Sequence, residues 1–195
     1  MVLGVCGRSC SGKNAVCEIL SEKGFLIVDA DELGQQALHA KKNEIIRLFG
    51  TSILNDEGQI DRQKLGQRVF SCAQDLQKLN AISHPYVVQE MQRVIRENPE
   101  RHIVLNAALL PMVRVPEVDV LIWVTADFFT RLIRGLKRDR RGLIFTLRRM
   151  WMQRNLSPKI FFKRVDIYTI RNGGNFTALK RCANQLLDLL FSLNQ

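Results

Sequence analysis

Near the N-terminus, Gly7 is followed by four further residues and then by Gly12 and Lys13. Glycines at this spacing let the backbone curl so that successive N–H groups point inward at phosphate oxygens. A lysine directly after the second glycine can reach the terminal phosphates as a mobile positive charge. The spacing therefore predicts a phosphate-binding loop in preference to an ordinary glycine-rich turn.

The residue after Lys13 departs from the usual pattern, because Asn14 stands where the hydroxyl of a serine or threonine normally binds Mg²⁺. An amide oxygen is also a hard ligand, so we expect Asn14 to bind Mg²⁺, although less tightly. The loop residues predicted to surround bound phosphates are Gly7, Arg8, Ser9, Cys10, Ser11, Gly12, Lys13 and Asn14.

Two carboxylates follow the second apolar run of the chain, at Asp29 and Asp31. The carboxyl ends of parallel strands lie on one edge of a sheet, so we expect both carboxylates to face the phosphate loop. One of them could accept a hydroxyl proton from a phosphoryl acceptor, or hold Mg²⁺ through a water. Alternatively, Asp31 could cap the helix that follows, and the two interpretations are compatible.

The phosphate loop must follow a buried strand and open a helix, and the neighbouring sequence supplies both. Residues 2–6 are a short apolar run, and residues 13–23 place apolar side chains on one helical face before Gly24 ends the helix. A second strand ends at Asp29, and a helix is expected from about Asp31. This order favours a right-handed parallel crossover.

The rest of the chain continues the same alternation. Several helices are expected between residues 41 and 98, with Pro85 at the first turn of one of them. Further strands are expected at 102–110, 118–126 and 166–172, and an amphipathic helix closes the chain. Five strands interleaved with helices predict an α/β fold with a five-stranded parallel sheet covered on both faces.

Composition predicts one domain and a cytoplasmic location. With 195 residues, 46% of them hydrophobic, the chain can bury one full core, so residues 1–195 are expected to form a single domain. The first 24 residues lack the uninterrupted apolar segment of a signal peptide. No apolar run approaches the roughly 20 residues that span a bilayer, so no membrane partner is expected.

The five cysteines are odd in number and scattered, which favours reduced thiols over disulfides or a zinc site. Cys10 differs from the others, because a thiol near a helix N-terminus can be reactive.

The net charge of +10 is concentrated between Arg131 and Arg154, where eight arginines and one lysine fall within 24 residues. This density indicates anionic partners such as nucleotide phosphates or nucleic acid. The alternative is a solvated helix face, but such faces normally intersperse both signs of charge. Asp139 is the only acid in the stretch.

Taken in order, these motifs resemble the dephospho-coenzyme A kinase family over nearly the whole chain. The resemblance rests on the phosphate loop, the Asp-Ala-Asp at 29–31, the His-Pro at 84–85, the segment 131–139 and the Ile-Arg-Asn-Gly-Gly at 170–174. It implies a P-loop kinase-like, three-layer α/β fold with a helical lid at about 137–158. The helical segment at about 57–98 would bind the acceptor.

The same resemblance implies ATP and dephospho-coenzyme A as substrates, Mg²⁺ as the metal, and the ribose 3′-hydroxyl as the acceptor group. It assigns Asp31 as the general base, with Asp29 beside it, and Lys13 with the loop backbone as the ATP site. His84 would contact the acceptor. Equally, it could be an ordinary helix-start residue ahead of Pro85, with no role in binding.

Four further residues take roles from the resemblance. Arg134 and Arg138 match arginines that begin the lid and neutralise charge on the transferred group, as phosphoryl transfer requires. Asn172 and Gly174 match a turn that lies against the adenine of ATP.

Some positions depart from the family. Gln35 replaces an arginine, Met112 stands where an acid is expected, and Arg131 replaces a glutamine. With Asn14, these changes leave open a catalytically weak relative that binds nucleotide or coenzyme A without efficient turnover. An RNA-binding role is disfavoured, because no aromatic-rich stacking motif accompanies the arginines. The sequence does not predict the oligomeric state.

Overall fold

The computed structural model describes residues 1–108, 117–139, 142–157 and 165–193. The chain forms two compact units. Residues Met1–Val28 and Asn98–Gln195 make the sheet unit, and Asp29–Glu97 make the helical unit.

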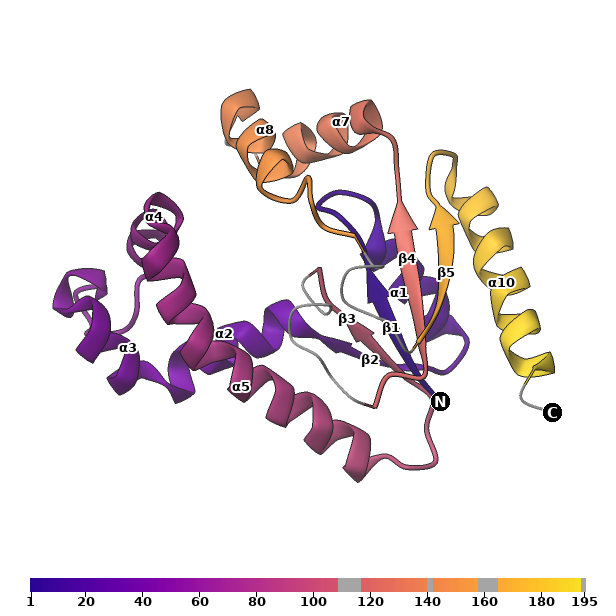
Figure 1. Ribbon diagram of the computed structural model, residues 1–195, viewed down its shortest axis with the longest axis horizontal. Coiled ribbons are helices and arrows are strands. Elements are labelled where there is room, and N and C mark those ends of the chain that lie inside the picture. The colour runs from indigo at the N-terminus through magenta and orange to yellow at the C-terminus, as the bar shows by residue number, and fades with distance from the viewer. Residues whose placement is uncertain (109–116, 140–141, 158–164, 194–195) are drawn as a thin grey trace. The chain divides into compact units, whose positions relative to one another are not determined.

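The sheet has five strands in the order β2-β3-β1-β4-β5 (Figure 1). Strands β1, β3 and β4 are almost entirely buried, which explains their continuous apolar sequences. The pairings of β1 with β3, β1 with β4 and β4 with β5 are all parallel. The strands are Val2–Cys6 (β1), Leu26–Asp29 (β2), Ile103–Asn106 (β3), Val120–Thr125 (β4) and Asp166–Arg171 (β5). The predicted five-stranded parallel sheet is therefore confirmed.

Two helices pack together against one face of this sheet. Helix α1 (Lys13–Glu22) ends before Gly24, as predicted, and α10 (Phe176–Ser192) is the amphipathic helix that closes the described chain. Their buried side chains join those of the strands in one core, represented by Val5, Leu20 and Leu187. Helices α7 (Phe128–Asp139) and α8 (Gly142–Met152) follow the carboxyl end of β4 (Figure 1).

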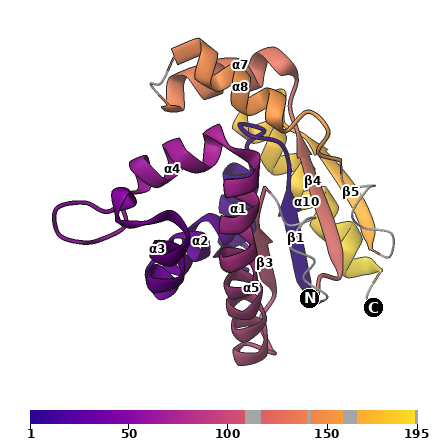
Figure 2. The ribbon, with the colours of Figure 1, turned by 60° about the vertical axis from the view of Figure 1, so that its left-hand side comes forward.

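The helical unit confirms that residues 41–98 contain no strand of the sheet. Its helices pack on one another (Figure 2). They surround a small apolar core that includes Ile45, Phe49 and Leu65. Its elements are α2 (Ala30–Ala40), α3 (Lys42–Phe49), a 3-10 turn (Thr51–Ile53), α4 (Arg62–Ser71) and α5 (Ala73–Glu97).

The prediction that Pro85 begins a helix is wrong, because Pro85 lies inside α5, a single helix of 25 residues. A proline inside a helix has no N–H to donate to the carbonyl four residues earlier. Packing on both sides compensates here: Leu79 lies against the small core of the helical unit, and Met91 is fully buried. The sequence signal for a helix start was therefore overridden by apolar contacts along the whole helix.

Within the described part of the chain, no helix is long and apolar enough to cross a membrane. The same residues contain no group of three or more histidine, cysteine or acidic side chains able to hold a metal ion.

Candidate active site

The predicted phosphate loop lies between β1 and α1. Gly12 has a left-handed backbone (φ 93°) directly before α1 and provides no side-chain cap. The N–H groups of the first turn are therefore left to donate to a ligand. They also form the positive end of the helix, so this site suits a phosphate group.

At two positions of the loop, neighbouring atoms come so close to the backbone that only glycine fits. A Cβ atom at Gly7 would collide with the carbonyl oxygen of Val124, and one at Gly12 with the side-chain amide of Asn172. Gly7 also has φ of 155°, a conformation that other residues rarely adopt. The glycine spacing in the sequence thus reflects contacts of the loop with β4 and with the end of β5.

Lys13 is half-buried, and its Nζ donates a hydrogen bond to the carbonyl oxygen of Gly7 at 3.2 Å. This bond joins the end of the loop to its start. The ammonium charge is thus held where a bound phosphate would meet it.

Arg134 and Asn172 converge on the carbonyl oxygen of Ser11, as Nη1 of Arg134 donates to it at 3.5 Å and Nδ2 of Asn172 at 3.0 Å. The two side chains are also joined, since Nη2 of Arg134 donates to Oδ1 of Asn172 at 3.3 Å. Asn172 is buried, with 6% of its surface exposed, and its backbone N–H donates to Thr125. The structure thus brings together three residues that the sequence placed far apart.

Arg131 binds a second carbonyl of the loop, because its Nε donates a hydrogen bond to the carbonyl oxygen of Ser9 at 2.9 Å. The side chain is only 6% exposed, and its Nη2 is buried without a hydrogen-bond partner among the described residues. Burial lowers the pKa of Arg131, and the nearby positive charge of Arg8 lowers it further. A bound anion would relieve both penalties.

Arg131 was missed as a site residue by sequence reasoning, which noted it only as a departure from the family. One signal was present: Arg131 and Arg134 are three residues apart in a helical stretch, so they share one face.

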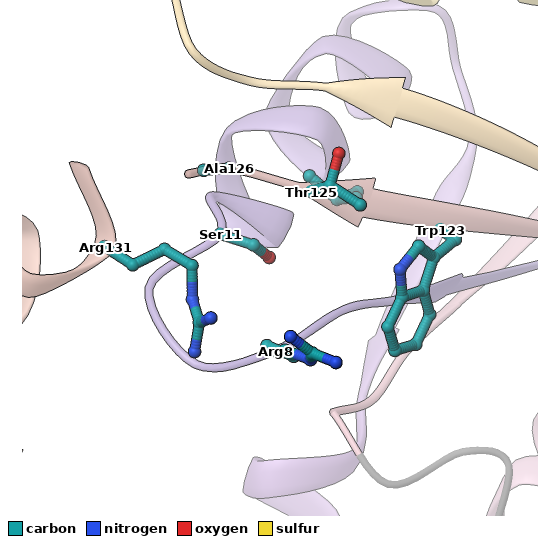
Figure 3. A pocket seen from close by; sticks show the side chains of 7 residues that line it. Arg8, Ser11, Trp123, Thr125, Ala126 and Arg131 are labelled. Atoms are coloured by element: carbon teal, nitrogen blue, oxygen red, sulfur yellow. The ribbon is translucent and has the colours of Figure 1, made fainter. Parts of the chain in front are cut away.

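Two cavities adjoin the loop, and Arg8 and Arg131 line both of them. The smaller, of about 200 Å³, also contacts Ser11, Trp123 and Thr125. Figure 3 shows the Arg131 side chain extending from α7 toward the loop that carries Arg8 and Ser11. The larger cavity, of about 650 Å³, is formed mainly by α7 and α8.

Two predicted residues, Arg138 and Gly174, are exposed and line neither cavity. Arg138 is exposed in the last turn of α7. Gly174 is also exposed, and a Cβ atom there would make only an ordinary 3.6 Å contact with Ala178. The structure therefore shows no steric need for glycine at Gly174.

The side chain of Asn14 is exposed at the start of α1, where its Oδ1 accepts a hydrogen bond from Nδ2 of Asn106 at 3.3 Å. A carbonyl-type oxygen has two acceptor positions, so this bond leaves one for a metal. Mg²⁺ usually takes only one or two protein oxygens and keeps phosphate and water as its other ligands. Asn14 fits that requirement.

Cys10 has a left-handed backbone (φ 62°) and lies three residues before α1, so it is not at the helix start assumed from the sequence. Its Sγ accepts a hydrogen bond from Nη2 of Arg149 at 3.2 Å. An arginine of α8, rather than the helix end, is thus its charged neighbour.

The two predicted carboxylates lie at the junction of β2 and α2. Oδ1 of Asp29 accepts from the backbone N–H of Asp31 at 2.8 Å, so Asp29 is the helix cap. The alternative that Asp31 caps the helix is wrong, because α2 begins one residue earlier, at Ala30. Asp31 lies in the first turn with an exposed side chain.

The remaining positions singled out in the sequence belong to different parts of the chain. His84 lies in the middle of α5 and is half-buried, and burial lowers its pKa below 6.5. Gln35 accepts a hydrogen bond from Nη1 of Arg62 at 3.1 Å. Met112 lies outside the described residues.

Comparison with known proteins gives this site a family. The family model for dephospho-CoA kinase matches residues 1–169. A dephospho-CoA kinase of Treponema denticola is 32% identical over 93% of this chain and 86% of its own length. One of Borreliella burgdorferi is 41% identical, but the match spans only 56% of this chain and 54% of that protein.

Among solved structures, the protein TT1252 from Thermus thermophilus superposes with a TM-score of 0.81 at 26% identity, over 97% of both chains. The chain belongs to the dephospho-CoA kinase family.

Proposed function

We propose that the protein transfers the γ-phosphoryl group of ATP to the ribose 3′-hydroxyl of dephospho-CoA, giving CoA and ADP. The observation that carries this proposal is the convergence of Arg134 and Asn172 on the Ser11 carbonyl of the phosphate loop. A nucleotide bound to the loop would have a guanidinium and an amide beside it. Membership of the dephospho-CoA kinase family supports ATP as the co-substrate.

On the donor side, the loop N–H groups and Lys13 hold the phosphates. Asn172 and Gly174 lie against the adenine, and Arg134 and Arg138 neutralise charge on the transferred group. Such preorganised donors act where charge develops in the transition state, which is the main catalytic contribution in phosphoryl transfer.

On the acceptor side, the Asp31 carboxylate takes the proton of the 3′-hydroxyl as its oxygen attacks the γ-phosphorus. Asp29 supports it by fixing the backbone N–H of Asp31. The acceptor-binding segment is about 57–98, which includes His84, and the lid is about 137–158, which includes all of α8. Residues 1–195 would act as one kinase domain.

Oδ1 of Asn14 is the protein oxygen proposed to hold Mg²⁺ at the phosphates. Bound there, Mg²⁺ would neutralise phosphate charge during transfer.

The test is turnover of the purified protein with ATP, Mg²⁺ and dephospho-CoA, with CoA identified by mass and ADP by a coupled assay. Asp31→Asn should lower kcat by about 10²-fold or more, as expected for loss of a general base. Asp188→Asn, at an exposed position of α10, is the matched control and should keep wild-type activity.

Absence of CoA from the wild-type reaction would reject the proposal. Binding of ATP and dephospho-CoA by calorimetry without turnover would instead support the weak, non-catalytic relative. Full activity in Asp31→Asn would remove the role given to that carboxylate.

A further inference from the structure

Helix α7 contacts the phosphate loop through two arginines that reach different carbonyls. Arg134 reaches Ser11 together with Asn172, and Arg131 reaches Ser9. Neither Arg134 nor Asn172 lines the cavities beside the loop. If the donor nucleotide occupies the side of Arg134 and Asn172, the cavities on the side of Arg131 are available to another ligand.

The larger cavity has the size and chemistry of a ligand site. Its volume of about 650 Å³ falls within the range of roughly 300–1,000 Å³ usual for small-molecule pockets. Five of its nine lining residues are apolar or aromatic, the other four are arginines, and none is acidic. Such a lining favours an anionic ligand that also carries an apolar or aromatic part.

The aromatic side chains suit a base. Trp151 is 65% exposed, and the guanidinium of Arg154 lies 4.1 Å from the centre of its ring. Phe128 is 49% exposed at the start of α7. Exposed indole and phenyl rings among arginines are the side chains on which nucleic-acid bases stack.

The arginines suit a diphosphate. Arg131 is more than nine-tenths buried, and its Nη2 has no hydrogen-bond partner within the described ranges. Arg8 lines the same cavity, and Arg148 adds a further guanidinium from α8. A buried donor without an acceptor is costly, so this group is prepared for an anion.

We propose that this cavity binds the adenosine diphosphate part of dephospho-CoA, with the base at Trp151 and Phe128 and the phosphates at the arginines. The inference rests on the proposed function. Phosphoryl transfer needs the attacking and leaving oxygens roughly in line, so the acceptor must approach the loop from a side that the donor does not occupy.

Steady-state kinetics with each substrate varied separately tests this assignment. Trp151→Leu and Arg148→Gln should each raise the KM for dephospho-CoA by about tenfold, the effect expected for loss of one base stack or one charged hydrogen bond. The KM for ATP should stay within about twofold of the wild-type value. A variant that weakens the binding of dephospho-CoA but not of ATP shows that the two substrates use separate sites.

Matched variants separate the cavity from general surface effects. Phe128→Ala removes a lining ring, whereas Phe129→Ala removes its neighbour, which is 72% exposed and does not line the cavity. Arg181→Gln removes an exposed charge of α10 as the control for Arg148→Gln. In each pair only the cavity variant, Phe128→Ala or Arg148→Gln, should change the KM for dephospho-CoA, and the control should not.

Two outcomes would overturn the inference while leaving the proposed function intact. One is an unchanged KM for dephospho-CoA in both Trp151→Leu and Arg148→Gln. The other is that these variants raise only the KM for ATP. Lack of any turnover by the wild type would reject the proposed function first, and with it this assignment. If Trp151→Leu fails to fold, Arg148→Gln and Phe128→Ala still decide the question.

Discussion

Asn106 donates a hydrogen bond from its side chain to Oδ1 of Asn14, at 3.3 Å. The bond links the end of β3 to the start of α1, and it orients the amide oxygen proposed to bind Mg²⁺. Asn14, which stands where a serine or threonine is usual, therefore has a hydrogen-bond donor at the end of β3.

Because an amide oxygen is expected to bind Mg²⁺ less tightly than the usual hydroxyl site, Asn14→Ser should raise activity at low Mg²⁺ and change little at saturation. The measurement is the initial rate against Mg²⁺ concentration at fixed ATP. Asn43→Ser, at an exposed position of α3, is the control. Equal rates of Asn14→Ser and wild type at every Mg²⁺ concentration would show that the position is not a metal ligand.

Gly7→Ala should destabilise the protein far more than Gly24→Ala. Both glycines have positive φ, but a Cβ atom at Gly24 would meet nothing within 4 Å, whereas one at Gly7 would collide with a backbone oxygen of Val124. Conformational strain alone costs about 1–2 kcal/mol, and the collision should add about 1–3 kcal/mol.

Urea unfolding of the two glycine variants and the wild type gives the comparison. Equal free energies of unfolding for Gly7→Ala and Gly24→Ala would mean that the loop moves away from β4 without cost.

The sheet and the phosphate loop could be predicted from the sequence because each depends on local pattern. Buried strands are continuous apolar runs, and the loop shows its glycine spacing directly. Arg131 could not be assigned in this way, because its role depends on a contact with Ser9 that is 122 residues away. The prediction that a helix starts at Pro85 was wrong for a related reason. The length of α5 is decided by its packing on other helices, which the local sequence does not show.

Arg62 should contribute to acceptor binding, because it donates to Gln35, the position at which the sequence resemblance leads us to expect an arginine. The guanidinium of Arg62 thus lies beside the site of the missing one. Arg62→Ala should raise the KM for dephospho-CoA about three- to tenfold, the range expected for an exposed charged hydrogen bond.

Adding Gln35→Arg to Arg62→Ala should restore much of that affinity. Arg47→Ala, at an exposed position of α3, controls for the loss of charge. An unchanged KM in Arg62→Ala, or no recovery in the double variant, would rule out the compensation.

His84 should make the protein sensitive to acid. Burial lowers the pKa of His84 in the folded protein below the ordinary value of 6.5. Below pH 6.5 the unfolded chain therefore binds more protons at this residue than the folded chain does, so stability falls as the pH falls. Well above that pH both states carry a neutral imidazole, and the residue contributes no pH dependence.

Replacing His84 with glutamine removes this titration. Between pH 7.5 and 5, the wild type should consequently lose more of its free energy of unfolding than His84→Gln does, as measured by urea titration at each pH. His39→Gln, at an exposed histidine of α2, is the matched control. A pH dependence in His84→Gln as steep as in the wild type would show that protonation of this imidazole is not coupled to folding.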